Sequence, residues 1–267
     1  MKEQLKVVVP FVLGVYLLVS LSANLAQSYV IFRSNDIFFS PPKNLDIEEV
    51  YIHSPDGQKL YAWWLQSKTA DKTILFFKGN GRNISYQGAR LAMFKTLDVN
   101  ALLVDYRGYG KSTGRIKVER DIYADGAAAW NYLVKIKGIP PENIIIWGRS
   151  LGGAVAAETA KAKGAGAVVL ESTFYSMDEI ARLKYWYLPT SLFLKFHFAN
   201  GEKLTRIKIP VIIIHSIEDG YIPFSQAARL YDAANEPKAF IKTRGSHIDS
   251  FEQNGVDLEI LKRHLDL

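Results

Sequence analysis

The stretch NIIIWGRSLGGA, residues 143–154, leads from an apolar run through a glycine-flanked serine into a segment of small residues. Gly148 and Gly152 flank Ser150 in the spacing G-x-S-x-G. In this motif the serine occupies a sharp, strained turn between a strand and a helix, and the flanking residues must be small so that the two elements can approach. The stretch therefore predicts a strand, a turn and a helix, with Ser150 as a candidate nucleophile. An ordinary glycine turn is the alternative, because five residues alone do not establish a nucleophile.

The sequence around this turn alternates between strand and helix patterns. Short apolar runs, typical of strands buried on both faces of a sheet, lie at 73–77, 101–104, 144–147, 167–170, 211–215 and, more weakly, 239–242. Helical patterns lie between them at 86–97, 118–135, 154–162, 224–234 and 256–264. Two earlier runs, 47–52 and 59–66, are joined by HSPDG, which indicates a hairpin. Together they predict an α/β fold whose mostly parallel sheet carries helices on both faces.

The N-terminus has a long apolar segment. Residues 7–32 are uncharged and follow Lys2 and Lys6. A membrane span needs about 20 mostly apolar residues, so residues 1–32 are predicted to be a single-pass N-terminal membrane anchor. A cleaved signal peptide is the alternative, because the small residues Ser20, Ser22 and Ala23 offer a processing site inside the segment. Cleavage there would give a secreted or periplasmic protein. The apolar residues that continue past this site favour an uncleaved anchor. Lys and Arg are equally frequent beside both ends of the segment, so they assign no side of the membrane.

The rest of the chain divides into two parts. Residues 33–44, RSNDIFFSPPKN, end near the pair Pro41-Pro42 and are predicted to be a linker. Residues 45–267 are long enough to bury one substantial core and are predicted to form a single catalytic domain.

Composition narrows the possible chemistry and partners. The chain has no cysteine, which excludes disulfides, thiolate metal sites and cysteine nucleophiles. The net charge is +6, but the 33 basic residues are dispersed among 27 acidic ones. Without a basic block, a nucleic-acid partner is not expected.

Gly110-Lys111-Ser112 is similar to the end of a phosphate-binding loop, yet Asp105 stands where its first glycine belongs, so no nucleotide site is predicted. Neither a cofactor nor a metal is predicted.

Residues that could complete a catalytic set with Ser150 follow other strands. His247 lies in the polar loop RGSHIDS after the last strand and is the candidate base. Asp219 follows the strand VIIIH and is the candidate acid that orients the imidazole. Glu171, which also ends a strand, is the alternative acid. The order serine, aspartate, histidine is the one that accompanies this type of serine turn. The other histidines are expected to be structural or at the surface: His53, His197, His215 and His264.

A tetrahedral oxyanion needs two backbone N–H donors. One comes from the residue after the nucleophile, and the other comes from the loop after an earlier strand. These positions are Leu151 and, in the run KGNGRN, Asn80.

Taken together, these motifs resemble the α/β-hydrolase superfamily, and most closely its membrane-anchored, serine-aminopeptidase-like branch. The resemblance covers roughly residues 45–265, through FFKGNGRNIS, LLVDYRGYGKSTG, IIIWGRSLGG, VIIIHSIEDGYIP and GSHID. It implies an eight-stranded sheet with a short cap, a catalytic triad of Ser150, Asp219 and His247, and an oxyanion hole from the amides of Asn80 and Leu151.

This chain departs from its relatives at two positions. They usually have His-Gly where it has Lys78-Gly79, and His-Gly where it has His215-Ser216. Neither position belongs to the triad, but Lys78 is expected to put a flexible cation beside the oxyanion loop.

The segment 172–205 is where such proteins carry a cap, and here it is short and aromatic. It is expected to form the ordinary core packing of a small cap, an apolar acyl pocket, or a surface that dips into the bilayer next to the anchor. The predicted function is a serine hydrolase that cleaves carboxylic esters or thioesters of a small-molecule or lipid-like acyl substrate through an acyl-enzyme. A peptidase or amidase with the same triad, and a non-catalytic binding protein at the membrane, are the alternatives. The sequence assigns no oligomeric state.

Overall fold

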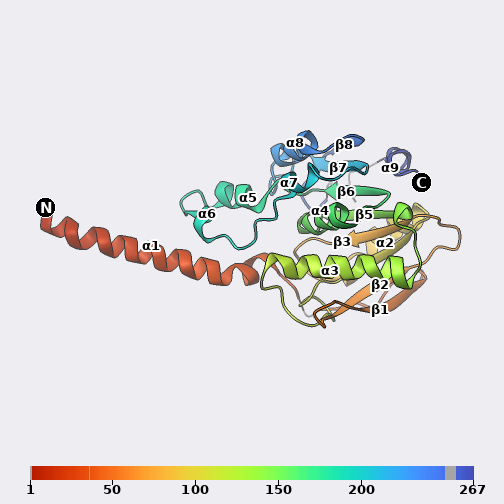
Figure 1. Cartoon of the computed structure of the whole chain (residues 1–267), viewed down its shortest axis with the longest axis horizontal. Helices are drawn as coiled ribbons and strands as arrows, with labels where there is room; N and C mark the ends of the chain where they lie inside the picture. The colour runs from red at the N-terminus through yellow and green to blue at the C-terminus, as the bar shows by residue number, and fades with distance from the viewer. Residues whose placement is uncertain (1, 36, 250–256) are drawn as a thin grey trace.

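The computed structural model describes residues 2–35, 37–249 and 257–267. Figure 1 shows a body built on one sheet, from which the long helix α1 (Lys2–Ile31) extends.

The sheet has eight strands in the order β1-β2-β4-β3-β5-β6-β7-β8. The hairpin β1–β2 and the pair β2–β4 are antiparallel, and all later pairs are parallel. This confirms the expected fold class. The strands are β1 (Ile47–His53), β2 (Lys59–Leu65), β3 (Thr73–Phe77), β4 (Asn100–Val104), β5 (Ile144–Arg149), β6 (Ala167–Glu171), β7 (Val211–Ser216) and β8 (Lys238–Thr243).

Alternate residues of the central strands point to opposite faces, as the period of a β-strand requires. In β3, Leu75 and Phe77 belong to a core cluster with α3, α4 and α8, whereas Ile74 and Phe76 belong to a second cluster with α2 and α9. Helices therefore cover both faces of the sheet. The helices of the body are α2 (Gly88–Thr96), α3 (Glu119–Asn131), α4 (Leu151–Lys163), α5 (Met177–Lys184), α6 (Thr190–Phe193), α7 (Asn200–Leu204), α8 (Phe224–Ala233) and α9 (Leu258–Leu265).

Two helices differ from the sequence-based expectation by three or more residues at one end. The helix expected at 118–135 is α3 followed by a π-helical segment, Tyr132–Ile136, before Gly138 turns the chain at a φ of 70°. The helix expected from residue 154 begins at Leu151, because the turn at Ser150 takes a single residue.

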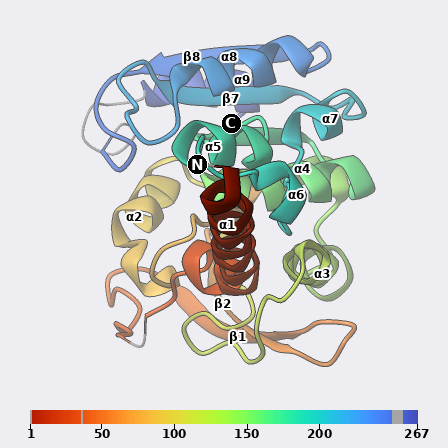
Figure 2. The same ribbon diagram turned by 90° about the vertical axis from the view of Figure 1, so that its left-hand side faces the viewer.

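Helix α1 stands largely outside the core. Its stretch Lys6–Ile31 has the length and apolarity to cross a membrane, with a mean hydropathy of 2.0, and only 6% of its most apolar part is buried. Figure 2 looks nearly along α1 and shows α5 and α6 beside it. Those two short helices and residues 185–189 between them form the cap.

The segment 33–44 packs on the body. Arg33 forms a β-bridge with Gly81, and the ring of Phe38 packs edge-on against the rings of Tyr61 and Trp63. The division of the chain into anchor, linker and catalytic domain stays a prediction.

Candidate active site

Ser150 makes the turn between β5 and α4 alone. Its φ is 52° and its ψ is −118°, a backbone conformation that residues other than glycine rarely adopt. Two neighbours hold it there: the backbone N–H of Ser150 donates to the carbonyl of Glu171 at 2.8 Å, and the hydroxyl of Thr173 donates to the carbonyl of Ser150 at 2.7 Å. Both come from the end of β6, so the parallel sheet itself fixes the turn.

The two motif glycines are required by close packing. A Cβ on Gly148 would lie 2.3 Å from the carbonyl oxygen of Gly152, and a Cβ on Gly152 would lie 2.0 Å from the carbonyl oxygen of Phe77. Neither contact is possible for a real side chain, so the small residues allow α4 to begin against the ends of β3 and β5.

The structure brings the three residues of the predicted triad together. His247 Nε2 lies 3.1 Å from Ser150 Oγ, and His247 Nδ1 lies 2.7 Å from Asp219 Oδ2. The three side chains follow β5, β7 and β8, at the carboxyl edge of the sheet where sites of this architecture form. A base in contact with a serine, and an acid in contact with that base, can activate the hydroxyl as a nucleophile.

Asp219 is held as a carboxylate. Burial acts to raise its pKa, but the hydrogen bond with His247 and those from the backbone N–H groups of Ile222 and Tyr221 outweigh burial and lower the pKa. Its Oδ1 accepts both backbone bonds, at 2.8 Å from Tyr221 N and 2.9 Å from Ile222 N. The other oxygen, Oδ2, is therefore left for the imidazole.

His215 is a structural residue, as expected. Its Nε2 lies 2.9 Å from the carbonyl of Ile222 and 3.5 Å from Asp219 Oδ2. Burial lowers the pKa of His215, so its ring stays neutral. The negative charge of Asp219 therefore remains available to the imidazole of His247. Two other histidines lie away from the triad: His53 is exposed at the end of β1, and His197 contacts Asp178 in the cap.

The alternative acid, Glu171, binds other residues and does not contact His247 directly. Its carboxylate binds Arg90 at 2.7 Å and the indole N–H of Trp147 at 2.7 Å, deep in the core. It also lies 3.2 Å from Nε of Arg149. Glu171 therefore reaches the histidine only through another residue.

That residue, Arg149, was missed by sequence reasoning. Its guanidinium donates to the carbonyls of Ile248 at 2.8 Å and His247 at 3.3 Å. Arg149 thus ties the histidine loop to the strand that carries the nucleophile. It occupies an unrestricted position of G-x-S-x-G, so the motif gave no signal for this role.

The predicted oxyanion donors lie on the two segments that border Ser150. Leu151 is the first residue of α4, where an α-helix leaves its N–H without an intrahelical partner. On the other side, a Cβ built on Gly79 would be 3.5 Å from the Cβ of Ser150, so this loop touches the nucleophile. The backbone at Asn80 is fixed by a hydrogen bond, which its carbonyl accepts from Tyr109 Oη at 2.8 Å.

Lys78 does not place a flexible cation at the site, and this corrects the expectation. The side chain is 1% exposed, and its ammonium lies 3.7 Å from the centre of the Tyr109 ring. It donates to the carbonyls of Arg82 at 3.1 Å and Gly79 at 3.3 Å, and it lies 4.0 Å from Asp105 Oδ1. Lys78 therefore shapes the oxyanion loop from inside the protein.

Burial shifts both members of this ion pair. It lowers the pKa of Lys78 and raises the pKa of Asp105, and each charge partly opposes the shift of the other. Asp105 also accepts a hydrogen bond from the backbone N–H of Ile84 at 2.9 Å. A Cβ on Gly110 would lie 2.3 Å from Asp105 Oδ2, so the first residue of the GKS run packs closely against this carboxylate.

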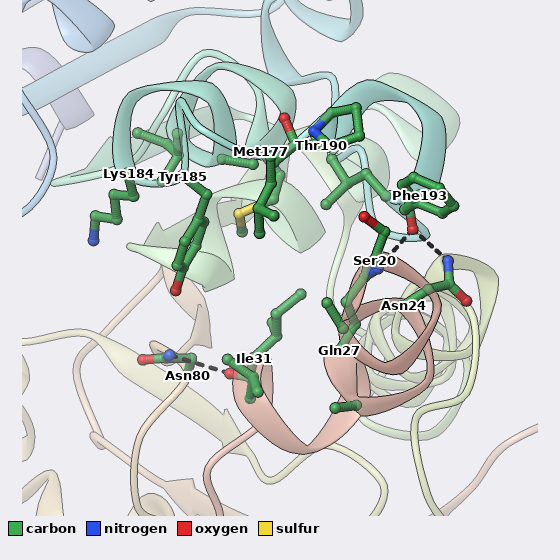
Figure 3. A pocket seen from close by; sticks show the side chains of 18 of the residues that line it. Ser20, Asn24, Gln27, Ile31, Asn80, Met177, Lys184, Tyr185, Thr190 and Phe193 are labelled. Carbon is green, nitrogen blue, oxygen red and sulfur yellow. Dashed lines mark hydrogen bonds between the residues drawn. The ribbon is translucent and has the colours of Figure 1, made fainter. Parts of the chain in front are cut away.

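A cavity of about 350 Å³ adjoins the site (Figure 3). Its walls are one face of α1 from Ser20 to Ile31, the cap, Asn80 and Tyr221. Tyr221 links the cavity to the site, because its ring lies 5.1 Å from the ring of His247; Ser150, Asp219 and His247 are not among the lining residues. The size of the cavity falls in the range of small-molecule sites. Across the described residues, no three His, Asp or Glu side chains gather where they could hold a metal ion.

Comparisons with known proteins agree with this fold. The family model described as serine aminopeptidase, S33, matches residues 68–198. An uncharacterised protein of Mycobacterium tuberculosis is 32% identical over 81% of this chain and 78% of its own. The human alpha/beta hydrolase domain-containing protein 17B is 33% identical over 81% of this chain and 74% of its own. Among solved structures, an esterase of Pyrococcus furiosus shares the fold, with a TM-score of 0.70, 18% identity, and coverage of 88% of this chain and 95% of its own.

Proposed function

Because this chain belongs to the α/β-hydrolase superfamily, within its serine aminopeptidase S33-like family, we propose that it is a serine hydrolase that cleaves carboxylic esters or thioesters of an apolar acyl group. The observation that carries the proposal is the unbroken series of contacts from Ser150 through His247 to Asp219. A mostly apolar cavity lies nearby, and its lining residue Tyr221 packs against the ring of His247.

The geometry supports a two-step reaction. His247 takes the proton from Ser150 as the hydroxyl attacks the acyl carbon, and Asp219 stabilises the imidazolium that forms. The backbone N–H groups of Leu151 and Asn80 donate to the oxyanion; each such donor is worth about a hundred- to a thousandfold in rate. His247 then protonates the leaving oxygen or sulfur, and water hydrolyses the acyl-enzyme by the reverse proton path.

The cavity favours an acyl group over a peptide. An aminopeptidase must bind the free α-amine of its substrate, for which a carboxylate is the natural partner. Among the described residues that line the cavity, the charged ones are Arg33 and Lys184, and none is acidic. A peptidase or amidase is the second candidate, supported by the description of the matching family model.

Fluorophosphonate labelling tests the nucleophile. We expect the wild-type protein to react and Ser150→Ala not to react, since the phosphonate esterifies the activated serine. A wild-type protein that stays unlabelled would favour the non-catalytic alternative. Acyl esters tested beside aminoacyl amides then separate the two enzyme classes, and faster turnover of the amides would overturn the ester proposal.

We also propose that α1 anchors the protein in a membrane and is retained. Several contacts support retention: Asn80 Nδ2 donates to the carbonyl of Ile31 at 3.1 Å, Arg33 N donates to the carbonyl of Asn80 at 3.0 Å, and Gln27 is bound to the cap. Signal cleavage would cut through the helix that makes these contacts. Sequencing the N-terminus of membrane-extracted protein is decisive, and a first residue beyond Ser22 would contradict retention.

A further inference from the structure

One face of α1 carries polar side chains, although the helix is long and apolar. Ser20, Asn24 and Gln27 are spaced by four and three residues, so they share a face. The side chains of Asn24 and Gln27 both donate to the carbonyl of Phe193 in α6, and the distance from Gln27 Nε2 is 2.7 Å. Gln27 also accepts from the backbone N–H of Lys195 at 2.8 Å. This face is a docking strip for the cap.

The docking strip lies at the depth of the membrane. The purely apolar part of α1, residues 7–19, rises only about 20 Å at 1.5 Å per residue. A hydrocarbon core is about 30 Å thick, so the span has to continue past Ser20 and into the docking strip. Backbone carbonyls at that depth need an internal partner, which Asn24 and Gln27 supply to Phe193.

The exposed side chains of the cap fit the same placement. Trp186 is 81% exposed and Tyr187 is 57% exposed, so the cap offers large apolar rings to its surroundings. The hydroxyl of Tyr16, on α1, donates to the carbonyl of Tyr187 at 3.1 Å. Tyr16 lies near the middle of a span that starts at residue 7, so this contact places the tip of the cap inside the bilayer beside α1.

The cavity lies between these two elements, as Figure 3 shows. It runs along α1 from Ser20 to Ile31, a rise of about 16 Å. Its inner end reaches Asn80, on the predicted oxyanion loop, and its outer end lies beside the part of α1 that the span requires.

We propose that α1 is a wall of the substrate site as well as an anchor, and that the cavity accepts the acyl chain of an ester or thioester dissolved in the same bilayer. This inference rests on the proposed hydrolase activity and adds the substrate class and its route. The chain slides from the lipid along α1 and beneath the cap, and brings its carboxyl carbon to Ser150.

Tryptophan substitutions on α1 test the wall. Ala23 and Ala26 line the cavity, whereas Leu25 points away from it and is 64% exposed. The full-length protein is placed in phosphatidylcholine nanodiscs and given p-nitrophenyl butyrate, octanoate and palmitate. We expect Ala23→Trp and Ala26→Trp to lower the ratio of palmitate turnover to butyrate turnover, because the added rings fill the part of the cavity that holds the long chain. Each methylene of the acyl chain that is kept out of the cavity lowers the turnover rate by about a factor of four. We therefore expect palmitate turnover to fall by more than about tenfold.

The control Leu25→Trp is expected to keep the wild-type profile, because its ring faces away from the cavity. Unchanged palmitate preference in both cavity variants, or an equal loss in Leu25→Trp, would overturn the inference. These results differ from failure of the proposed function, in which the wild-type protein neither labels nor cleaves any ester.

A second comparison tests the route through the bilayer. An S-palmitoyl peptide or a palmitoyl glycerol ester is placed either in the nanodisc that holds the protein or in separate phosphatidylcholine vesicles. We expect hydrolysis to be at least about tenfold faster when substrate and protein share a bilayer, and the faster of the two substrates identifies the head group. Equal rates in the two arrangements would refute access from the membrane.

Discussion

Replacing Lys78 by methionine is expected to destabilise the protein in a pH-dependent way. The side chains of Lys78 and Asp105 are 1% and 0% exposed, and their charged atoms lie 4.0 Å apart. Removing one partner of such a buried pair costs about 3–5 kcal/mol, because the remaining charge is left in the interior. Methionine fills much of the lysine's space and removes the cost of burying the ammonium, so we expect a loss near the lower end, about 3 kcal/mol. This loss applies at about pH 7.5, because burial lowers the pKa of Lys78 to about 8.

The sign of the pH effect follows from Asp105. Its pKa is raised in the folded protein, so the folded state holds a proton that the unfolded state releases. Stability therefore falls as pH rises from the unfolded pKa to the folded one. Without Lys78 the folded pKa lies higher still, and the fall continues to a higher pH. At about 1.4 kcal/mol per pH unit for one proton, the stability deficit of Lys78→Met should be clearly smaller at about pH 6 than at about pH 7.5.

Denaturant unfolding of the full-length protein in mild detergent, at both pH values, measures the effect. Lys111→Met is the matched control: Lys111 lies 3.1 Å from Glu49, but both side chains are 43% exposed, so its loss should cost no more than about 1 kcal/mol. Adding Asp105→Asn to Lys78→Met should remove most of the pH dependence. A loss below about 1 kcal/mol, or the same loss at both pH values, would refute the buried ion pair.

Three further substitutions probe the site. Gly152→Ala should destabilise the protein by more than about 2 kcal/mol in thermal unfolding, because its Cβ would meet a carbonyl at 2.0 Å, whereas Gly88→Ala, in open space, should change little. Arg149→Met should lower kcat about tenfold with KM nearly unchanged, since it removes the bonds that position the histidine loop; a change confined to KM would contradict that role. Asp219→Asn should lower kcat by up to about 10⁴-fold, as in other triads. Because the pKa of Asp219 is lowered, its ionised form stabilises the fold above about pH 4, and the stability difference from Asp219→Asn should shrink below that pH.

Much of the fold could be predicted from sequence because the buried strands are short apolar runs. Thr73–Phe77 was expected at its observed bounds, and G-x-S-x-G marked the turn after β5. The triad residues could be placed because each follows its own strand. The direction of the Lys78 side chain could not, since its partners Asp105 and Tyr109 come from a loop nearly thirty residues away.

The cavity was also only partly predictable. The apolar N-terminus indicated a helix, but the role of Asn24 and Gln27 could not be predicted from it. Both side chains bind the carbonyl of Phe193, which lies almost 170 residues later in the chain. Hydropathy treats such polar residues as interruptions, because it measures each segment alone. Contacts between distant segments decide whether they face lipid, water or protein.

The turn at Ser150 has a consequence for how activity and stability trade against each other. A non-glycine residue at a φ of 52° and a ψ of −118° costs of the order of 1–3 kcal/mol, because its Cβ crowds the backbone. Glycine would adopt the same turn without that cost. The proposed nucleophile therefore stands where the backbone would be more stable without its side chain. We expect a Ser150→Gly protein to lose the proposed activity and yet to be harder to unfold, which would separate the requirements of the fold from those of the chemistry.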